Sequence, residues 1–254
     1  MDLFASDLDN TLIYSYKRDI GTDTVCAEVY EGRKVSFMTN RSRELLEKVN
    51  QTMHFVPVTT RSVQQYQRIR FGDTWSPRLA LAANGGVLLR DGVSDLDWYK
   101  ASCDLIAPAE PALQQAEDVL EHDPNRTLDV RRVDGLFVFT KSADVPHTLA
   151  RLRDALDLTH VELFENGVKV YVVPRVLNKG TGVRRLREWF PEARVFAAGD
   201  SLFDLPLLAA ADTAFCPETL DYTGQPEQMV VTVSPQDGVF SDVVLGRLTE
   251  NIDR

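Results

Sequence analysis

Short apolar runs that lead directly into polar residues constrain the fold of this chain most strongly. Runs of this kind, without polar alternation, are typical of strands buried on both faces of a parallel sheet. The segments that flank them repeat apolar residues at helical spacing. The expected strands are Leu3–Ser6, His54–Val58 and Val195–Ala198, and the expected helices are Asn40–Asn50 with Thr39 as N-cap, Gly180–Trp189 and Phe203–Ala211. This alternation predicts an α/β fold with a doubly wound, mainly parallel, Rossmann-like sheet.

A β-hairpin is predicted between the first expected strand and the first expected helix. Val25–Tyr30 and Lys34–Met38 are rich in β-forming residues, and Glu31-Gly32-Arg33 joins them. Because the hairpin follows the end of the first strand, we expect it to project from the carboxyl edge of the sheet. Ligands bind at that edge in folds of this class.

The middle of the chain has a different pattern, in which a helix followed by a hairpin occurs twice. The helices are predicted at Glu110–Glu121 and Asp144–Leu156, and the strands at Thr127–Arg132, Leu136–Thr140, His160–Phe164 and Val168–Val173. Asp134-Gly135 and Asn166-Gly167 are two-residue turn signals between paired strands. Trp98–Pro108 is expected to be irregular. We therefore predict an inserted α+β domain at 91–175 and a sheet domain built from 1–90 and 176–254.

Charge and composition exclude several classes of function. The 254 residues contain 28 Lys and Arg against 38 Asp and Glu, a formal net charge of -10, so no nucleic-acid partner is expected. The first residues lack the basic and apolar regions of a signal peptide, and no apolar stretch is long enough to span a membrane. Cys26, Cys103 and Cys216 are too few and too widely spaced for a disulfide framework. We expect a cytoplasmic protein without membrane association.

Four polar features occur in a fixed order at the predicted strand ends and helix starts. They are Asp7-Leu8-Asp9-Asn10-Thr11, Thr59, Lys179, and Gly199-Asp200 followed by Asp204. Each alone has an ordinary structural explanation, such as an acidic turn, a helix cap or a solvated surface charge. Together, in this order, they indicate one site at the carboxyl edge of the sheet.

These features resemble the motifs of the haloacid dehalogenase-like superfamily, in particular its Cof-type phosphatases with a C2 cap. Val58-Thr59-Thr60-Arg61 is similar to the family's Ala-Thr-Gly-Arg, and Asn84-Gly85-Gly86 to its Asn-Gly-Ala turn. Asn178-Lys179-Gly180 precedes the third expected helix. The resemblance covers essentially the whole chain. It implies a catalytic core interrupted by an inserted α+β cap between the second and third motifs.

The resemblance also implies roles for individual residues in hydrolysing a phosphate monoester. Asp7 would attack phosphorus to form an aspartyl-phosphate, and Asp9 would serve as general acid and then general base. Thr59 and Lys179 would hold the transferring oxygens as negative charge develops on them. The remaining substrate contacts are expected at Leu8 and Thr60, through backbone N–H groups, and at Arg61 and Asn178. Arg61 has a second interpretation, a salt bridge at the start of a helix, which we favour.

A magnesium ion is the cofactor that the resemblance implies. Its ligands would be the carboxylates of Asp7 and Asp200 and the backbone carbonyl of Asp9, since Mg²⁺ prefers hard oxygen ligands and retains several waters. Asp204 would orient Lys179 or a metal-bound water. Two residues depart from the family pattern, because Phe203 stands where Asn is frequent and Thr60 where Gly is usual.

The expected function is therefore a Mg²⁺-dependent phosphatase acting on a small phosphorylated metabolite such as a sugar phosphate. Two alternatives stay open at this point. One is a phosphomutase or phosphotransferase that returns the phosphoryl group to a sugar. The other is a binding or regulatory module without turnover. The motifs name no individual substrate and no protein partner.

Overall fold

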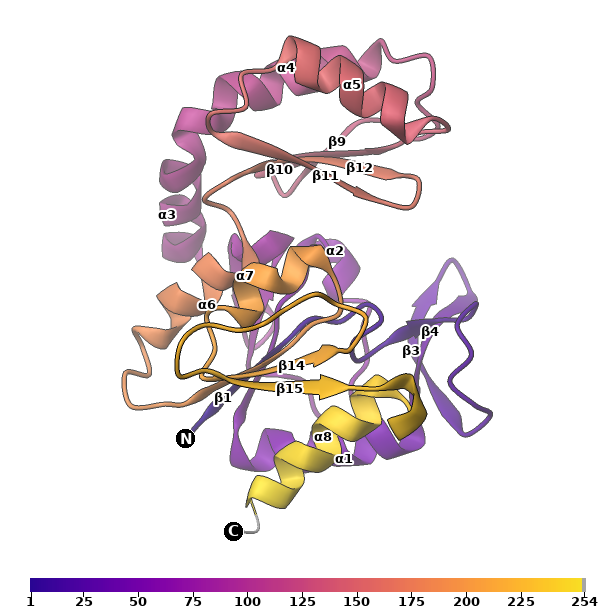
Figure 1. Ribbon diagram of the computed structural model, residues 1–254, viewed down its shortest axis with the longest axis vertical. Helices are drawn as coiled ribbons and strands as arrows, with labels where there is room; N and C mark the ends of the chain where they lie inside the picture. The colour runs from indigo at the N-terminus through magenta and orange to yellow at the C-terminus, as the bar shows by residue number, and fades with distance from the viewer. Residues whose placement is uncertain (253–254) are drawn as a thin grey trace. The chain divides into compact units, whose positions relative to one another are not determined.

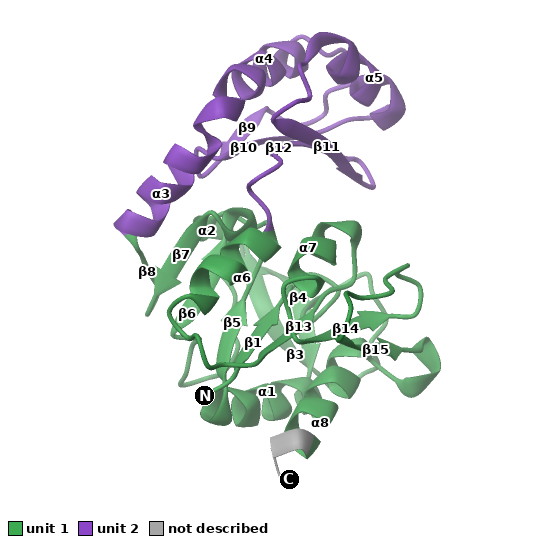
Figure 2. Cartoon of the chain, turned by 60° about the vertical axis from the view of Figure 1, so that its left-hand side comes forward, with its two compact units in different colours: residues 1–95, 179–254 green, residues 96–178 purple. Residues whose placement is uncertain are grey.

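The chain divides into two compact units, which Figure 2 distinguishes by colour. The computed structural model describes the backbone of residues 1–252 and the side chains of residues 1–250. Unit 1 comprises Met1–Asp95 and Lys179–Arg254, and unit 2 comprises Leu96–Asn178. Unit 2 begins five residues later and ends three residues later than the insertion expected at 91–175.

Parallel strands form the main sheet of unit 1 in the order β15-β14-β13-β1-β5 (Figure 2). Their bounds are β1 (Leu3–Ser6), β5 (His54–Pro57), β13 (Val195–Ala198), β14 (Thr213–Pro217) and β15 (Met229–Val233). All residues of β1 and β13 are buried, as expected for strands covered on both faces. The predicted α/β class with a parallel sheet is thus confirmed, and β14 and β15 extend the sheet beyond the three expected strands.

The helices of unit 1 are α1 (Asn40–Thr52), α2 (Val63–Tyr66), α6 (Lys179–Arg187), α7 (Leu205–Leu208) and α8 (Phe240–Ile252). Thr39 caps α1 as predicted, since its hydroxyl accepts from the backbone N–H of Ser42 at 2.9 Å. Helix α1 lies beside α8 (Figure 1). The carboxylate of Asp242 joins the two helices by accepting from the hydroxyls of Thr39 and Ser42, both at 2.5 Å.

The helix predicted at Phe203–Ala211 is wrong in length. A 3-10 turn, η3 (Leu202–Asp204), comes first, and α7 covers only Leu205–Leu208. Pro206 has no backbone N–H to donate, so it suits the first turn of a helix rather than its interior. The helix predicted at Gly180–Trp189 begins one residue earlier and ends two residues earlier than expected.

The predicted hairpin is present as β3 (Thr24–Tyr30) and β4 (Arg33–Thr39). Glu31 and Gly32 form its turn with φ of 49° and 76°, both positive, as a two-residue turn of type I′ requires. A short strand, β2 (Tyr14–Ser15), completes a sheet of order β2-β4-β3. We call this three-stranded element the hairpin sheet.

A further antiparallel sheet of unit 1 follows α2 and contains β6 (Leu79–Ala82), β7 (Val87–Arg90) and β8 (Val93–Ser94). The turn between β6 and β7 contains Ala83 and Asn84, whose φ angles of 47° and 61° are both positive. This turn carries the Asn84-Gly85-Gly86 sequence that was compared above with a family motif.

Unit 2 is an α+β layer, in which α4 (Glu110–Glu121) and α5 (Val145–Ala155) cover one face of a four-stranded antiparallel sheet (Figure 1). The sheet order is β11-β12-β10-β9, with bounds β9 (Arg131–Val133), β10 (Phe137–Lys141), β11 (Val161–Asn166) and β12 (Lys169–Pro174). Leu113, Leu120 and Leu152 of the helices pack with Val138 and Val172 of the sheet. The predicted α+β class of the insertion is confirmed.

Two predictions within unit 2 are wrong. Trp98–Pro108 is not irregular, because Leu96–Ile106 forms the helix α3, with Trp98, Ser102 and Ile106 buried at four-residue intervals. The polar Ser102 interrupts the apolar stripe and hides the period. The strand predicted at Thr127–Arg132 covers only Arg131–Val133, although the backbone N–H of Thr127 also donates to the Lys141 carbonyl of β10 at 2.8 Å.

The hairpin turns of unit 2 differ from the predicted two-residue turns. Val133 pairs with Phe137, so the first loop has three residues and includes Leu136 as well as Asp134-Gly135. Asn166 pairs with Lys169, so the second turn consists of Gly167 and Val168. In each turn a glycine has the positive φ that the turn requires: Gly135 at 76° and Gly167 at 59°. The register of the paired strands decides which position of the turn the glycine occupies.

Across the described residues, the structure contains no helix with both the length and the apolar character needed to cross a membrane.

A pair of glycine substitutions tests the packing of α6 against α7. A Cβ at Gly180 would lie 2.0 Å from the backbone oxygen of Pro206, so we expect Gly180→Ala to lower the free energy of unfolding by about 1–3 kcal/mol. A Cβ at Gly246, within α8, would meet nothing within 4 Å. Gly246→Ala is the control and should raise the free energy of unfolding by about 0.5–1 kcal/mol. Urea unfolding measures both changes, and wild-type stability in Gly180→Ala would contradict the close approach.

Candidate active site

Three polar segments meet at the carboxyl edge of the main sheet, as the parallel strand order predicts. Asp7 follows β1, Thr59 follows β5 and Gly199 follows β13. The backbone N–H of Asp7 donates to Ala198 at 2.9 Å, and that of Val58 donates to Ser6 at 2.7 Å. The ladder therefore continues to the ends of the strands and places the three segments side by side.

Lys179 lies between two carboxylates at this edge. Its Nζ is 2.5 Å from Oδ1 of Asp7 and 2.5 Å from Oδ1 of Asp204. Lys179 is 1% exposed, Asp7 6% and Asp204 0%. The first residue of α6 thus places a buried ammonium against the residue that follows β1. Hydrogen bonds between charged groups are the strongest kind available in such surroundings.

Asp204 organises the loop that follows β13. Its Oδ2 accepts from the backbone N–H groups of Asp200 and Ser201 at 3.1 and 3.0 Å and from the Ser201 hydroxyl at 2.7 Å. A Cβ at Gly199 would lie 2.3 Å from the Cβ of Asp204, so glycine allows this close approach. Both oxygens of Asp204 are therefore engaged, one by Lys179 and the other by the loop.

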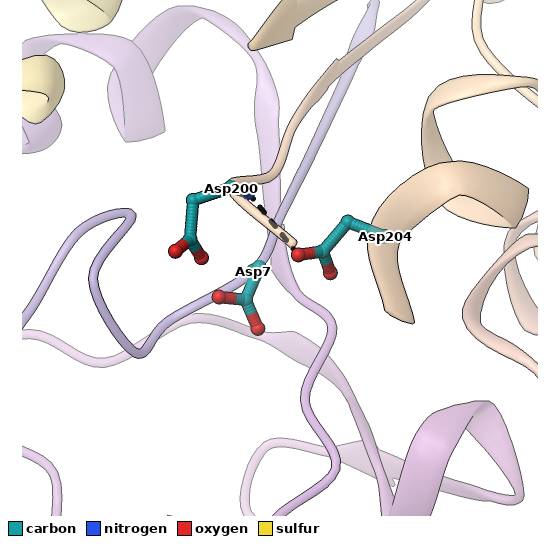
Figure 3. A group of neighbouring side chains, drawn as sticks. All are labelled: Asp7, Asp200 and Asp204. Carbon is teal, nitrogen blue, oxygen red and sulfur yellow. Dashed lines mark hydrogen bonds between the residues drawn. The ribbon is translucent and has the colours of Figure 1, made fainter. Parts of the chain in front are cut away.

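Asp7, Asp200 and Asp204 form an acidic cluster (Figure 3), in which one carboxylate oxygen from each lies within 4.8 Å of the others. Lys179 contacts only Oδ1 of Asp7, and the Thr11 hydroxyl donates only to Oδ1 of Asp200, at 3.2 Å. Within the described part of the chain, the second oxygens of Asp7 and Asp200 accept no hydrogen bond. These two carboxylates fit a divalent cation better than Asp204 does, because its oxygens already accept four hydrogen bonds.

The electrostatics of the cluster also favour a cation. Burial raises the pKa of the Asp7 carboxyl well above its usual range; Lys179 opposes the shift and Asp204 adds to it. Burial, and then the neighbouring Asp204 carboxylate, raise the pKa of Asp200 to about 6. Burial lowers the pKa of Lys179, but the carboxylates of Asp204 and Asp7 outweigh burial and raise it. Lys179 is therefore charged, and negative charge exceeds positive charge in the cluster.

The side chain of Asp9 is bound by Arg61 rather than by the Asp7 cluster. Arg61 Nε lies 2.8 Å from Oδ2 of Asp9, and Nη2 lies 2.7 Å from Oδ1. The remaining Nη1 of Arg61 donates to Glu28 Oε2 at 2.8 Å. The salt bridge that we favoured for Arg61 in the sequence is thus present, with Asp9 and Glu28 as its partners.

The other predicted site residues take less central positions. Thr59 is 1% exposed, and its hydroxyl accepts from the backbone N–H of Arg61 at 3.1 Å. Leu8 is fully buried, so only its backbone is available to a ligand; its carbonyl accepts from the N–H groups of Thr11, Leu12 and Ile13. Thr60 is partly exposed. Asn178 is the last residue of unit 2, and its amide donates to the Arg175 carbonyl at 3.1 Å.

Sequence reasoning missed three side chains that support the site. Thr11 contacts Asp200, Ser201 contacts Asp204, and Glu28 of β3 contacts Arg61. Thr11 and Ser201 lie within motifs that were recognised, so their positions offered a signal. For Glu28 the only signal in the sequence was an acidic residue inside a strand of mainly apolar residues.

Comparisons with known proteins agree with this fold. No family model matches the chain. A curated phosphoglycolate phosphatase from Methanothrix thermoacetophila is 29% identical over 131 residues, which are 50% of this chain and 54% of that protein. The match therefore spans about half the length of this curated relative.

Solved structures resemble the whole chain. The sucrose-phosphatase of Synechocystis sp., solved with sucrose and phosphate, has a TM-score of 0.65 at 17% identity, with 98% of this chain and 97% of that chain covered. A trehalose-6-phosphate phosphatase related protein has a TM-score of 0.58 at 13% identity, with 99% of each chain covered. A phosphatase of the haloalkanoate enzyme superfamily from Bacteroides thetaiotaomicron has a TM-score of 0.55 at 14% identity, with coverage of 98% and 95%. These likenesses establish the fold that the sequence resemblance implied.

The raised pKa of Asp200 makes a prediction for the metal-free protein. A carboxyl whose folded pKa of about 6 exceeds its ordinary value of 3.8 binds protons more tightly when folded. The free energy of unfolding should therefore fall as the pH rises from about 4 to about 6, by about 1–3 kcal/mol. Asp200→Asn should reduce this fall and be more stable than wild type at pH 7.

Chemical denaturation from pH 4 to pH 7 in the presence of a chelator measures this effect. Asp212→Asn, at an ion pair with Arg187 elsewhere in unit 1, is the matched control and should keep the wild-type fall. An identical pH dependence in wild type and Asp200→Asn would contradict the predicted shift.

Proposed function

Because the chain has the fold of haloacid dehalogenase-like phosphatases, we propose that it is a divalent-metal-dependent phosphatase acting on a small phosphorylated metabolite. The observation that carries this proposal is the buried Lys179 ammonium, held between Asp7 and Asp204 beside Asp200. A carboxylate nucleophile needs a cationic group nearby to approach a phosphate dianion. This arrangement supplies one ammonium and a pair of carboxylates suited to a metal.

Asp7 is the proposed nucleophile. Its carboxylate oxygen would form a bond to phosphorus while the bond from phosphorus to the ester oxygen breaks, giving an aspartyl-phosphate. Lys179 touches Oδ1 of Asp7 and would hold a transferring oxygen as the charge redistributes. The Asp204 carboxylate keeps the Lys179 ammonium in place on its other side.

Asp9 is the proposed general acid and base. In its neutral form it would give a proton to the leaving ester oxygen, and as the resulting carboxylate it would take a proton from the water that attacks the aspartyl-phosphate. Its side chain is 51% exposed, so solvent and substrate can reach it. The two proton transfers return Asp9 to its starting state after one turnover.

The cofactor we propose is Mg²⁺, held by the carboxylates of Asp7 and Asp200 and the backbone carbonyl of Asp9. A bound divalent cation would neutralise charge between the nucleophile and the phosphate. The surrounding residues fit this function. The Thr11 hydroxyl donates to Asp200 and orients it. The oxygens of Asp204 already accept hydrogen bonds from Lys179 and from the loop after β13, which leaves Asp7 and Asp200 for the metal.

The substrate class we propose is a sugar phosphate or a related polyol phosphate. The support is that sucrose-phosphatase and a trehalose-6-phosphate phosphatase related protein share the fold. The proposed substrate contacts are the Thr59 hydroxyl, the backbone N–H groups of Leu8 and Thr60, and the Asn178 side chain. We assign Arg61 instead to its salt bridges with Asp9 and Glu28. Unit 2 is proposed to be the cap that selects among substrates. The free thiols of Cys26, Cys103 and Cys216 support a proposed cytoplasmic location.

A panel of phosphorylated metabolites tests the proposed function. We expect phosphate release from a few sugar phosphates in the presence of Mg²⁺ and background release in the presence of EDTA. Asp7→Asn removes the nucleophile while preserving the side chain's shape, and should reduce release to the uncatalysed level. Accumulation of an isomeric sugar phosphate without free phosphate would contradict hydrolysis, and tight ligand binding without turnover would contradict an enzyme.

A second measurement tests the role of Asp9. Asp9→Asn cannot donate or accept the proton, and we expect kcat to fall by about 100- to 10,000-fold. The fall in kcat/KM, which reports the steps up to departure of the leaving group, should be smaller for a substrate such as p-nitrophenyl phosphate, whose leaving group needs little protonation. Equal losses of kcat/KM for p-nitrophenyl phosphate and a sugar phosphate would argue against the acid role. Asp19→Asn, at an exposed position in unit 1, is the control.

A further inference from the structure

A buried carboxylate of the hairpin sheet lies one side chain away from Asp9. Glu28 is 3% exposed and sits in β3, where the pairing with β4 shifts register on both sides of it. A bulge of this kind redirects a side chain relative to a regular strand, and bulges are frequent beside active sites. Here the redirected residue is charged, buried and aimed at Arg61.

Glu28 is held by three hydrogen-bond donors. Oε2 accepts from the Ser36 hydroxyl at 3.0 Å and from Arg61 Nη1 at 2.8 Å. Oε1 accepts from Arg68 Nε at 2.9 Å. A buried carboxylate requires such partners, because its charge has lost the stabilisation of water.

Arg61 connects this carboxylate to Asp9. One edge of its guanidinium donates twice to Asp9, at 2.8 and 2.7 Å, while Nη1 donates to Glu28. A paired contact of this kind fixes orientation as well as distance, because the guanidinium is planar and rigid. Arg61 is also largely enclosed, with 14% of its side chain exposed. The orientation of Asp9 therefore depends on where Glu28 holds the guanidinium.

We propose that Glu28 is a positioning residue that acts through Arg61 to set the orientation of the Asp9 carboxylate. This inference rests on the proposed function, in which Asp9 transfers the protons. Anchoring the hairpin sheet does not by itself require the contact with Arg61. The Glu28–Arg68 pair, the hydrogen bond from the Arg70 N–H to Ala27 at 2.8 Å and the bridge between Glu28 and Ile69 already join the hairpin to the segment after α2.

The first test compares three single variants by kcat, KM and thermal unfolding. Glu28→Gln removes the charge that holds Arg61, and we expect kcat to fall by about 10- to 100-fold with KM within about twofold of wild type. Arg68→Gln breaks the other salt bridge of Glu28, and Glu31→Gln changes an exposed carboxylate in the turn of the same hairpin. Both controls should keep kcat within about twofold. Equal losses of kcat in Glu28→Gln and Arg68→Gln would assign Glu28 to anchoring alone and overturn the proposal.

A double-mutant cycle tests whether the effect passes through Arg61. In an Arg61→Met background, Glu28→Gln should cause no further loss of kcat, because the connecting side chain is already absent. Additive losses would overturn the proposal. If Glu28→Gln does not fold, Arg61→Lys serves instead, since it leaves the Glu28–Arg68 pair in place and removes the paired contact with Asp9. An unchanged kcat in Arg61→Lys would also overturn the proposal.

A crystal structure of Glu28→Gln separates this inference from the proposed function. We expect the guanidinium of Arg61 to lose at least one of its two bonds to Asp9. Retention of both bonds would overturn the positioning role whether or not the protein is a phosphatase. Conversely, if the Glu28→Gln structure has lost a bond and the wild-type protein releases no phosphate, the positioning of Asp9 is supported and only the hydrolytic function is rejected.

Discussion

The buried ammonium of Lys179 is the interaction on which the arrangement of unit 1 depends. It joins Asp7, 172 residues earlier in the chain, to Asp204, 25 residues later. Three charged groups leave water together at this point, and removing one partner of such a set typically costs about 3–5 kcal/mol, since a buried charge is left uncompensated. The ends of β1 and β13 and the start of α6 are consequently held in one relative position. A site that must place a nucleophile within reach of a phosphate requires this kind of fixed geometry.

Glycine makes that geometry possible at two positions. Gly180 allows α6 to approach the backbone of Pro206, and Gly199 allows the loop after β13 to approach Asp204. A side chain at either position would separate the elements that carry Lys179 and Asp204. Gly180 directly follows Lys179, and Gly199 directly precedes Asp200. Each motif therefore contains both a charged residue of the site and a glycine that allows a neighbouring element to approach it closely.

The main features of the core were predictable because the relevant signals are local. A short apolar strand ending in polar residues defines both a buried position and a sheet edge, and β1 and β13 appear with the predicted bounds. Features that depend on tertiary packing could not be predicted from the sequence. The buried face of α3 includes Ser102, which bonds the Trp98 carbonyl and reads as polar in the sequence. Glu28 was equally hidden, because nothing adjacent to it in the chain shows that a bulge directs it toward Arg61.

The electrostatic settings of Asp7 and Asp9 explain how two neighbouring carboxylates acquire different properties. Asp7 belongs to a group with Asp200 and Asp204 that has one ammonium for three carboxylates. Asp9 and Glu28 are instead matched by two guanidinium groups, those of Arg61 and Arg68. A divalent cation would therefore balance the first group, whereas the second is neutral as it stands. Burial is the main cause of the raised pKa of Asp7, and the neighbouring carboxylates add to it. Their excess negative charge suits this group to a metal, and the matched charges around Asp9 leave its orientation to the guanidinium. The fold gives Asp7, the proposed nucleophile, and Asp9, the proposed proton-transfer group, separate sets of basic partners although only one residue lies between them.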